Sequence, residues 1–257
     1  MKMTRVLTPL AIAVAAMVSA QHAAADMWSD GDFVVRVGAS WVDANDDDKQ
    51  FRLSDDVFGA DFDVDSDTTW NISGAWLPAE HWGVELMYIG STNHDLDIRG
   101  IRDSDGFIYT DERFRVGSFD AEYSNAFVNW YPLSRDCLGQ PYIGIGVNYT
   151  DFSDENIRAA LSDTINDPLL GLDIRNVQYG LGHSWGIAGQ AGVDFRFGRD
   201  SAFLVNAAVL YIDADTDLTT YFTETIVTDP LTSRRRAVTS SVDYSPWIFN
   251  LGVGYSF

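Results

Sequence analysis

Three things are scarce in this chain of 257 residues, and each scarcity excludes a class of structure or partner. Cys137 is the only cysteine, so the fold has no internal disulfide bond to stabilise it. Beyond the first 25 residues, no apolar run approaches the roughly 20 residues that a membrane-spanning helix requires, and the longest candidate, 203–212, is interrupted by Asn206. Positive charge is scarce too, with 17 Lys and Arg against 38 Asp and Glu and a net charge of -21. A chain without a basic footprint is a poor match for phosphate backbones, which excludes a nucleic-acid partner.

The first 25 residues have the composition of an export signal. Lys2 and Arg5 give a positive start, Val6–Val18 is an apolar run, and Ala23–Ala25 offers a small-residue cleavage site. The apolar run is too short to span a membrane as a helix. We therefore expect residues 1–25 to be a cleaved secretory signal peptide and residues 26–257 to form a single exported domain.

Aromatic residues are abundant, and the end of the chain alternates strictly. The chain holds 8 Trp, 11 Tyr and 15 Phe. From Trp247 to Phe257 every second residue is large and apolar, and the residues between are small or polar except Ile248. A period of two is the period of a β-strand. An apolar row, a small inner row and a terminal aromatic are typical of the last strand of a transmembrane β-barrel, whose aromatic girdles would account for the tryptophans.

Eight segments show this alternation between turn residues, with lengths near the about 9–11 residues that a tilted strand needs to cross a bilayer. Three connections are short, whereas the other four each exceed twenty residues. Short periplasmic turns and long extracellular loops are typical of outer-membrane barrels. The sequence therefore predicts an all-β fold, an eight-stranded antiparallel transmembrane β-barrel. The predicted strands are 33–43, 67–77, 82–92, 119–131, 141–152, 184–197, 202–213 and 245–257.

Two parts of this pattern stay open. In 119–131 the lipid-facing phase is ambiguous, because Val128 and Trp130 compete with Phe127 and Tyr131. In the third long loop, apolar residues over 154–170 recur at a helical period, so a short helix and an irregular loop fit equally well.

The strand phase opposite to the lipid-facing one should point into the lumen, and its composition is mixed. Its charged members are Arg36, Glu85, Asp194 and Arg196. Its apolar members include Met87, Ile89, Leu204, Leu210 and Ile212. Eight strands leave room only for side chains or one small ligand, so we expect the two acids and two arginines to pair with one another. The apolar set fits either ordinary packing or a passage for a small hydrophobic molecule.

Five motifs in order along the chain resemble the OmpW family of small outer-membrane barrels. They are Gly83–Leu86, Pro141–Thr150, Ser184–Phe195, Leu204–Asn206 and Pro246–Phe257. The likeness covers most of the predicted strands, and the loops match poorly. It implies an eight-stranded barrel in the cell outer membrane with a hydrophobic lumen. It also implies a channel for passive uptake of small hydrophobic molecules, with lateral exit through the barrel wall.

The same resemblance implies an apolar constriction made by two residues. By motif these positions fall on Met87, directly after Gly83–Leu86, and on Leu210, six residues after Leu204. Both belong to the inward apolar set. Some relatives have an aromatic residue in place of Leu210, so the constriction here is expected to be looser or shaped for a different ligand.

A non-transporting barrel of the OmpA or OmpX type, which anchors, adheres or acts as a receptor, is the alternative function. An enzyme would need a nucleophile and a base within hydrogen-bonding reach. The only adjacent pair, His183 and Ser184, would face opposite sides of a strand, so we expect no enzyme.

The alternating Asp61, Asp63, Asp65 and Asp67 lack the Gly and Glu that a calcium-binding EF-hand loop requires, so we expect no metal and no cofactor. The expected partners are the lipid bilayer, lipopolysaccharide, small hydrophobic molecules and the barrel assembly machinery, which would recognise Phe257.

Overall fold

The structure, a computed structural model, describes residues 32–44, 50–52, 59–102, 108–110, 113–135, 137–157, 172–197, 202–226 and 233–257. The predicted signal peptide, residues 1–25, lies outside these ranges. No helix in the described ranges is long and apolar enough to cross a membrane.

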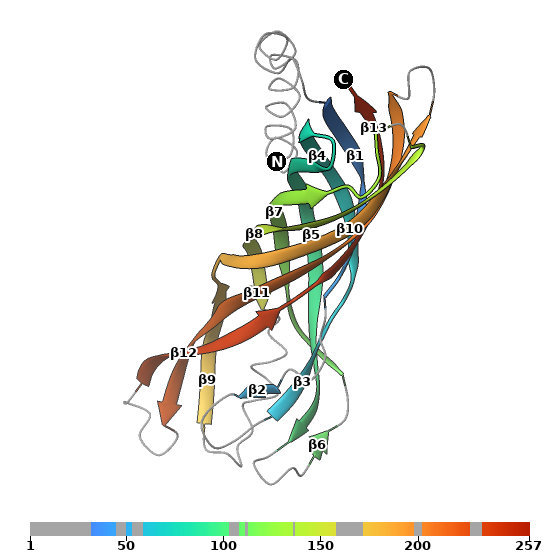
Figure 1. Cartoon of the computed structure of the whole chain (residues 1–257). Helices are drawn as coiled ribbons and strands as arrows, with labels where there is room; N and C mark the ends of the chain where they lie inside the picture. Colours follow the sequence, from blue (N-terminus) through green and yellow to red (C-terminus); the bar gives the residue numbers. More distant parts are fainter. Residues whose placement is uncertain are drawn as a thin grey trace, which may run out of the picture.

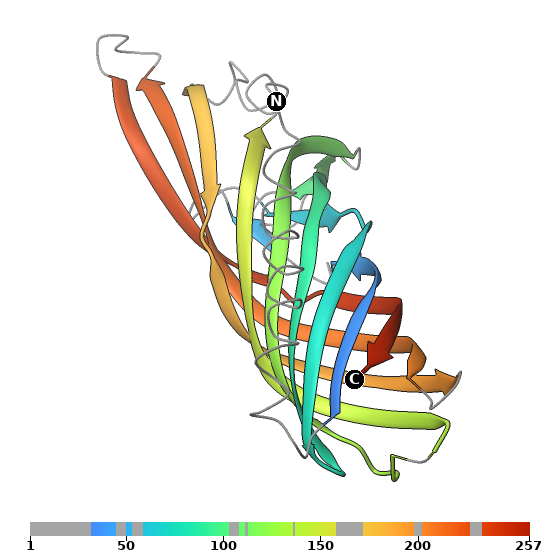
Figure 2. The ribbon, with the colours of Figure 1, turned by 90° about the horizontal axis from the view of Figure 1, so that it is seen from above.

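Eight antiparallel strands close into a barrel, which confirms the predicted fold class (Figures 1 and 2). Each strand pairs with the next of these eight along the chain, and the last, β13, pairs with the first, β1. Closure leaves no free sheet edge, because each of the eight strands is hydrogen-bonded to a neighbour on both sides. The strands are β1 (Asp32–Asp43), β4 (Asp67–Ala79), β5 (Trp82–Arg102), β7 (Phe114–Trp130), β8 (Gly139–Ile157), β10 (Ser184–Phe197), β11 (Phe203–Ile226) and β13 (Trp247–Ser256).

The sheet extends well beyond the barrel on the side of the long connections. β5 and β11 continue past the predicted strand ends and carry shorter partners there. On β5 these are β3 (Gly59–Val64) and β6 (Ile108–Thr110), and on β11 they are β9 (Leu172–Leu181) and β12 (Ser233–Tyr244). A further short strand, β2 (Gln50–Arg52), pairs with β3. The extension lies at the end of the barrel opposite to the C-terminus (Figures 1 and 2).

The predicted third loop begins later than expected. β8 continues as a strand to Ile157, so over 154–157 the chain forms neither of the two structures left open, a short helix or an irregular loop. There the segment adds its backbone hydrogen bonds to β7. The rest of that segment, 158–170, lies outside the described residues.

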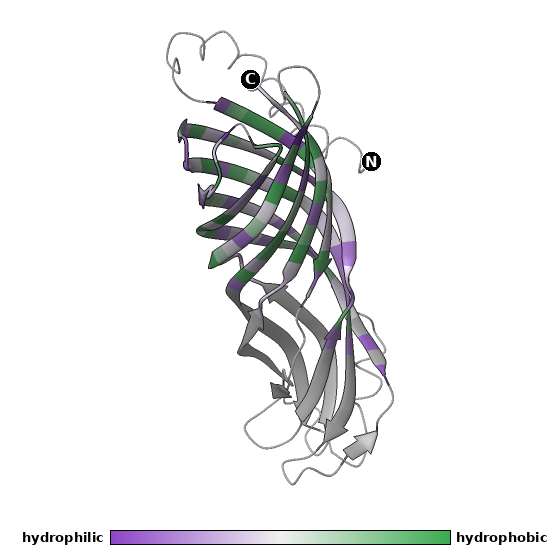
Figure 3. Cartoon of the chain, turned by 45° about the vertical axis from the view of Figure 1, so that its right-hand side comes forward, coloured by the Kyte–Doolittle hydropathy of each residue, from purple (hydrophilic) through white to green (hydrophobic). Residues whose placement is uncertain are grey.

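Along the strands of the barrel wall, hydrophobic and hydrophilic residues alternate (Figure 3), and exposed side chains alternate with buried ones. On β5, Leu86 is 65% exposed, whereas its neighbour Glu85 is fully buried. The ambiguity in 119–131 is resolved, because Phe127 and Tyr131 are buried and Val128 and Trp130 are exposed. Phe127 fits inside the lumen because Gly146 stands opposite it, where a Cβ would come 2.7 Å from the Phe127 ring.

Outward aromatic rings form two belts, one near each end of the membrane-spanning wall. Toward the extension, Trp41 stacks on Phe249 with ring centroids 5.3 Å apart, and Tyr211 contacts Trp247 with ring centroids 4.9 Å apart. Phe203 and Tyr255 meet near the C-terminal end. Such belts mark the two interfaces of the bilayer. The membrane-spanning part of β5 therefore ends near Tyr88, which lies against Trp70.

Candidate functional site in the barrel lumen

An apolar layer crosses the lumen about halfway along the barrel. Four of the five apolar residues predicted to point inward lie in it. They are Met87, Ile89, Leu210 and Ile212, of which Met87 is 5% exposed and the others are fully buried. Phe127 and Ile248 belong to the same cluster. Leu204, the fifth, belongs to a second cluster with Leu77 and Tyr142.

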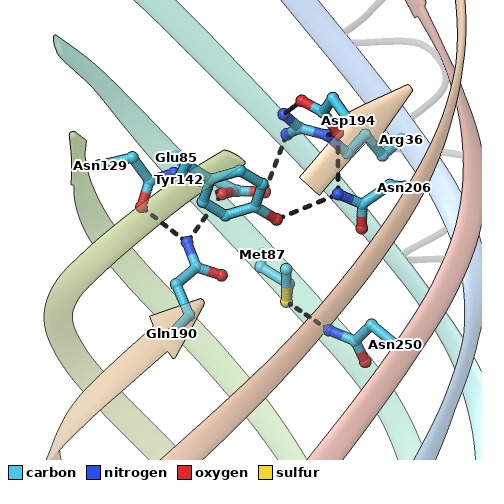
Figure 4. A network of polar contacts seen from close by, with 9 residues as sticks. All are labelled: Arg36, Glu85, Met87, Asn129, Tyr142, Gln190, Asp194, Asn206 and Asn250. Atoms are coloured by element: carbon cyan, nitrogen blue, oxygen red, sulfur yellow. Dashed lines mark hydrogen bonds and ion pairs between the residues drawn. The ribbon is translucent and has the colours of Figure 1, made fainter. Parts of the chain in front are cut away.

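A buried ion-pair network lies next to the apolar layer (Figure 4). Nε and Nη2 of Arg36 donate to the two carboxylate oxygens of Asp194 at 3.1 Å and 2.5 Å, and Nη1 donates to Glu85 at 3.1 Å. Asn206 donates to Asp194 at 2.8 Å and to the Tyr142 hydroxyl at 3.0 Å. One guanidinium therefore serves two carboxylates inside the barrel, with the ring of Tyr142 also close to its cation.

Amide side chains complete the coordination of Glu85. Asn129 and Gln190 donate to Glu85 Oε2 at 2.7 Å and 2.9 Å, and Gln190 donates also to Asn129 Oδ1 at 2.7 Å. A carboxylate with this many donors is well accommodated in a medium of low dielectric constant. Asn129 was missed from the sequence, because the phase of its strand was ambiguous there.

Arg196 does not join this network, so the predicted pairing of two acids with two arginines is wrong in part. Arg196 points inward but is partly exposed, and it forms no ion pair with either carboxylate in the described part of the chain. It lies two residues nearer the end of β10 than Asp194 and pairs in register with Leu204. The two acids are instead shared by Arg36 and by the amide groups of Asn206 and two further side chains described above.

The two layers have a fixed order along the barrel axis. Glu85 is two residues nearer than Met87 to the turn at Glu80–His81. Asn206, which pairs with Asp194, is four residues nearer than Leu210 to the start of β11. The charged network therefore lies on the periplasmic side of the apolar layer.

A third layer, which the sequence did not reveal, fills the lumen on the extracellular side. His94 is fully buried and contacts the rings of Phe119 and Tyr244. Its Nε2 lies 2.8 Å from Thr92 Oγ1 and 3.1 Å from the Tyr244 hydroxyl, which in turn lies 2.6 Å from that of Tyr123. We call these five residues the His94 cluster.

The chemistry of the His94 cluster favours a neutral imidazole. Nδ1 lies 2.7 Å from the backbone carbonyl of Asp65, which only accepts, so Nδ1 carries the proton. Nε2 is then the acceptor for a hydroxyl. His94 lies beyond the membrane-spanning part of β5, and burial lowers its pKa from the ordinary value.

The reason for missing His94 is a β-bulge. The register between β5 and β7 shifts between Ile89 and Thr92, so the inward residues change from odd to even numbers. A strict period of two carried past Gly90 points Asn93 rather than His94 inward. Gly90 was the available signal, since an isolated glycine inside a strand often marks a bulge.

The residues considered for catalysis or for metal binding do not form a site. His183 is exposed against the ring of Tyr149, whereas Ser184 is buried. Asp63 pairs with Arg113, and Asp67 accepts from the backbone of Thr68 and Asn93 at 2.7 Å and 2.8 Å. Within the described residues, no group of three or more potential ligands is placed to hold a metal ion.

A closed barrel with an apolar outside and aromatic belts defines an integral outer-membrane protein. The sequence profile of the OmpW family matches residues 29–257. The chain belongs to the OmpW family, as its motifs predicted.

Known relatives agree with this assignment. Outer membrane protein W of Escherichia coli (strain K12) is 26% identical over 258 residues, which cover 98% of this chain and 99% of the relative. Outer membrane protein W of Salmonella typhimurium is 27% identical over 76% of each chain. The crystal structure of the outer membrane protein OprG from Pseudomonas aeruginosa is 28% identical, with a TM-score of 0.61 over 88% of this chain and 96% of that one. The solid-state NMR structure of outer membrane protein AlkL, at 20% identity, has a TM-score of 0.54 over 89% of this chain and 90% of that one, which shows the shared fold. None of these relatives carries an enzymatic name.

Proposed function

We propose that the protein is a channel for the passive uptake of small hydrophobic molecules. The observation that carries the proposal is the buried apolar layer of Met87, Ile89, Leu210 and Ile212, which crosses a lumen that would be polar throughout in a water-filled pore. Met87 and Leu210 are its constriction, since they extend into the lumen from strands on different sides of the barrel. The layer performs no covalent chemistry, and the protein is not an enzyme.

The charged network supports a sideways exit. An apolar molecule that descends past Met87 meets Arg36, Glu85 and Asp194, all at most 2% exposed. Passing straight on would separate buried ion pairs, at about 3–5 kcal/mol for each lost partner. Leaving through the wall at the level of Leu86, which faces lipid, keeps the molecule in apolar surroundings.

Uptake of naphthalene, followed by its fluorescence, tests the channel in cells that carry the protein. Met87→Arg and Leu210→Arg place a charge in the apolar layer and should reduce uptake to that of cells without the protein. Met87→Leu and Leu210→Met keep the layer apolar and should retain uptake. Heat-modifiable gel mobility checks that every variant is present as folded barrel. Equal uptake by all four variants would contradict a route through this layer.

The exit is tested separately in vesicles that contain the purified protein. With a sideways exit, naphthalene enters the bilayer equally fast whether or not the vesicle interior holds a cyclodextrin acceptor. A route straight through the barrel would require the internal acceptor for rapid uptake.

A non-transporting barrel is the second candidate, and one observation favours it. Side chains fill the lumen at every described level, from Leu204 through Arg36 and Leu210 to His94. A barrel that only presents its outer extension would give the same naphthalene uptake as cells that lack the protein.

A further inference from the structure

Of the buried polar atoms that have no hydrogen-bond partner among the described residues, three belong to side chains that pair with Met87 or Leu210 in the sheet register. They are Ser73 Oγ, Asn125 Nδ2 and Gln190 Oε1, from side chains that are 4%, 4% and 5% exposed. Buried polar groups are bonded in the great majority of cases, so each exception calls for an explanation. Three exceptions beside the same two apolar residues point to a shared cause.

These atoms surround the proposed constriction. In the sheet register, Met87 pairs with Ser73 on one side and with Asn125 on the other. Gln190 pairs with Leu210. Each residue of the apolar pair therefore has at least one buried polar neighbour with an unused hydrogen-bonding atom.

The three atoms also have complementary chemistry. The Ser73 hydroxyl both donates and accepts, the Asn125 amide nitrogen donates, and the Gln190 amide oxygen accepts. A ligand group that does both, such as an alcohol or a primary amide, would satisfy them. A saturated hydrocarbon would leave all three unsatisfied.

Met87 is the apolar side chain next to two of these three residues, Ser73 and Asn125. Figure 4 shows it between Gln190 and Asn250. Its sulfur receives one long hydrogen bond, from Asn250 Nδ2 at 3.6 Å. Methionine is unbranched and adapts its shape easily, so rotation of Met87 can make room without moving the backbone.

We propose that this level of the lumen binds the polar head of a small uncharged amphiphile, while its short apolar chain lies against Leu210, Ile89 and Ile212. The inference rests on the proposed channel function and narrows its substrate class. A carboxylate head is disfavoured, because Gln190 is bonded directly to Glu85 and the adjacent network holds two acids to one arginine. An ammonium head would lose its hydration without gaining a free carboxylate.

Binding is measured by NMR on the folded barrel with methyl-labelled methionine, where Met87 lies in the site itself. Hexanol and heptane, matched in length, are titrated in the same detergent. Partition of each ligand into detergent is the same for every variant. A change in the ratio of the apparent hexanol and heptane affinities between variants therefore reports binding to the protein. Hexanol should shift the Met87 methyl signal saturably.

Ser73→Ala is the sharpest variant, because its hydroxyl makes no hydrogen bond within the described protein that the substitution would break. It should weaken hexanol binding about threefold to tenfold, the range for one lost hydrogen bond, and leave heptane binding unchanged. Gln190→Leu should do the same, and gel mobility confirms its folding. Ser124→Ala, on the outward face beside Asn125, is the matched control and should change neither ligand.

The possible results separate this inference from the channel itself. If Ser73→Ala and Gln190→Leu leave the ratio of hexanol to heptane within about twofold of the wild type, the head-group site is wrong, even where naphthalene uptake persists. If neither ligand shifts the Met87 signal and naphthalene uptake is absent, both proposals fail together.

Discussion

Replacing Arg36 tests whether water is excluded from the charged layer of the lumen. Arg36→Met keeps most of the length and the apolar stem of the side chain but removes the guanidinium. Glu85 and Asp194 then remain as two buried carboxylates without a cation, each at most 1% exposed. The three hydrogen bonds of 2.5–3.1 Å from Arg36 are lost together.

The expected loss of stability is about 3–5 kcal/mol, because removing one partner leaves an uncompensated buried charge. Two further variants bracket this value. Arg36→Lys keeps the charge but offers a single point of contact, so its cost should be intermediate. Arg36→Met combined with Glu85→Gln and Asp194→Asn removes all three charges and should recover most of the loss, because a buried ion network replaced as a whole is often close to neutral.

The assay is urea unfolding of the barrel in lipid vesicles, followed by tryptophan fluorescence and gel mobility. A loss below about 1 kcal/mol for Arg36→Met would show that water reaches the carboxylates, since an exposed ion pair is worth only that much. The same result would remove the barrier on which the sideways exit depends. A triple variant no more stable than Arg36→Met would refute the reasoning from uncompensated charge.

Three shorter predictions concern other levels of the barrel. Gly192→Ala should cost about 1–3 kcal/mol of unfolding free energy, because its Cβ would lie 2.6 Å from the Tyr142 ring; adding Tyr142→Leu should recover part of it. Burial lowers the pKa of His94 below 6.5, so the barrel should lose stability as the pH falls from 6.5 toward that lower pKa. His94→Gln should lose less stability over the same pH range. Urea unfolding at both ends of this range measures the difference. Phe257→Ala keeps the backbone bond of 2.8 Å to Phe33, so the purified barrel should unfold within about 1 kcal/mol of the wild type while the yield of folded barrel in cells falls; an unchanged yield would contradict recognition of the terminal ring by the assembly machinery.

The barrel wall was predictable because lipid imposes a simple rule on each strand. The expected segment 184–197 coincides with β10, Ser184–Phe197, since its outward residues must all be apolar there. The outer extension was missed because no lipid surrounds it, so its strands carry no apolar alternation. The run from Asp217 to Ile226 held a weaker signal, since threonine and aromatic residues are enriched in strands.

The partners inside the lumen could not be read from the sequence. Arg36 and Asp194 are 158 residues apart, on strands that are not neighbours. Which inward side chains meet across a barrel depends on the stagger between strands, and alternation says nothing about stagger. The phase rule therefore placed each charge inside the barrel, but it assigned Arg196 to a network whose carboxylates are bonded to Arg36 and to amide side chains instead.

The bulge in β5 shows how one residue decides what the lumen contains. Without it, Asn93 and Asp95 would face inward beside Phe119 and Phe152, where an unpaired carboxylate is strongly disfavoured. With it, His94 enters the aromatic cluster as a neutral acceptor, and Asp95 pairs with Arg115 instead. The extra residue is left unpaired, so the hydrogen-bond ladder is disrupted only locally. At the bulge, the inward-facing residues of β5 change from odd to even numbers. One continuous strand can therefore line an apolar lumen and still carry acidic residues in the outer extension.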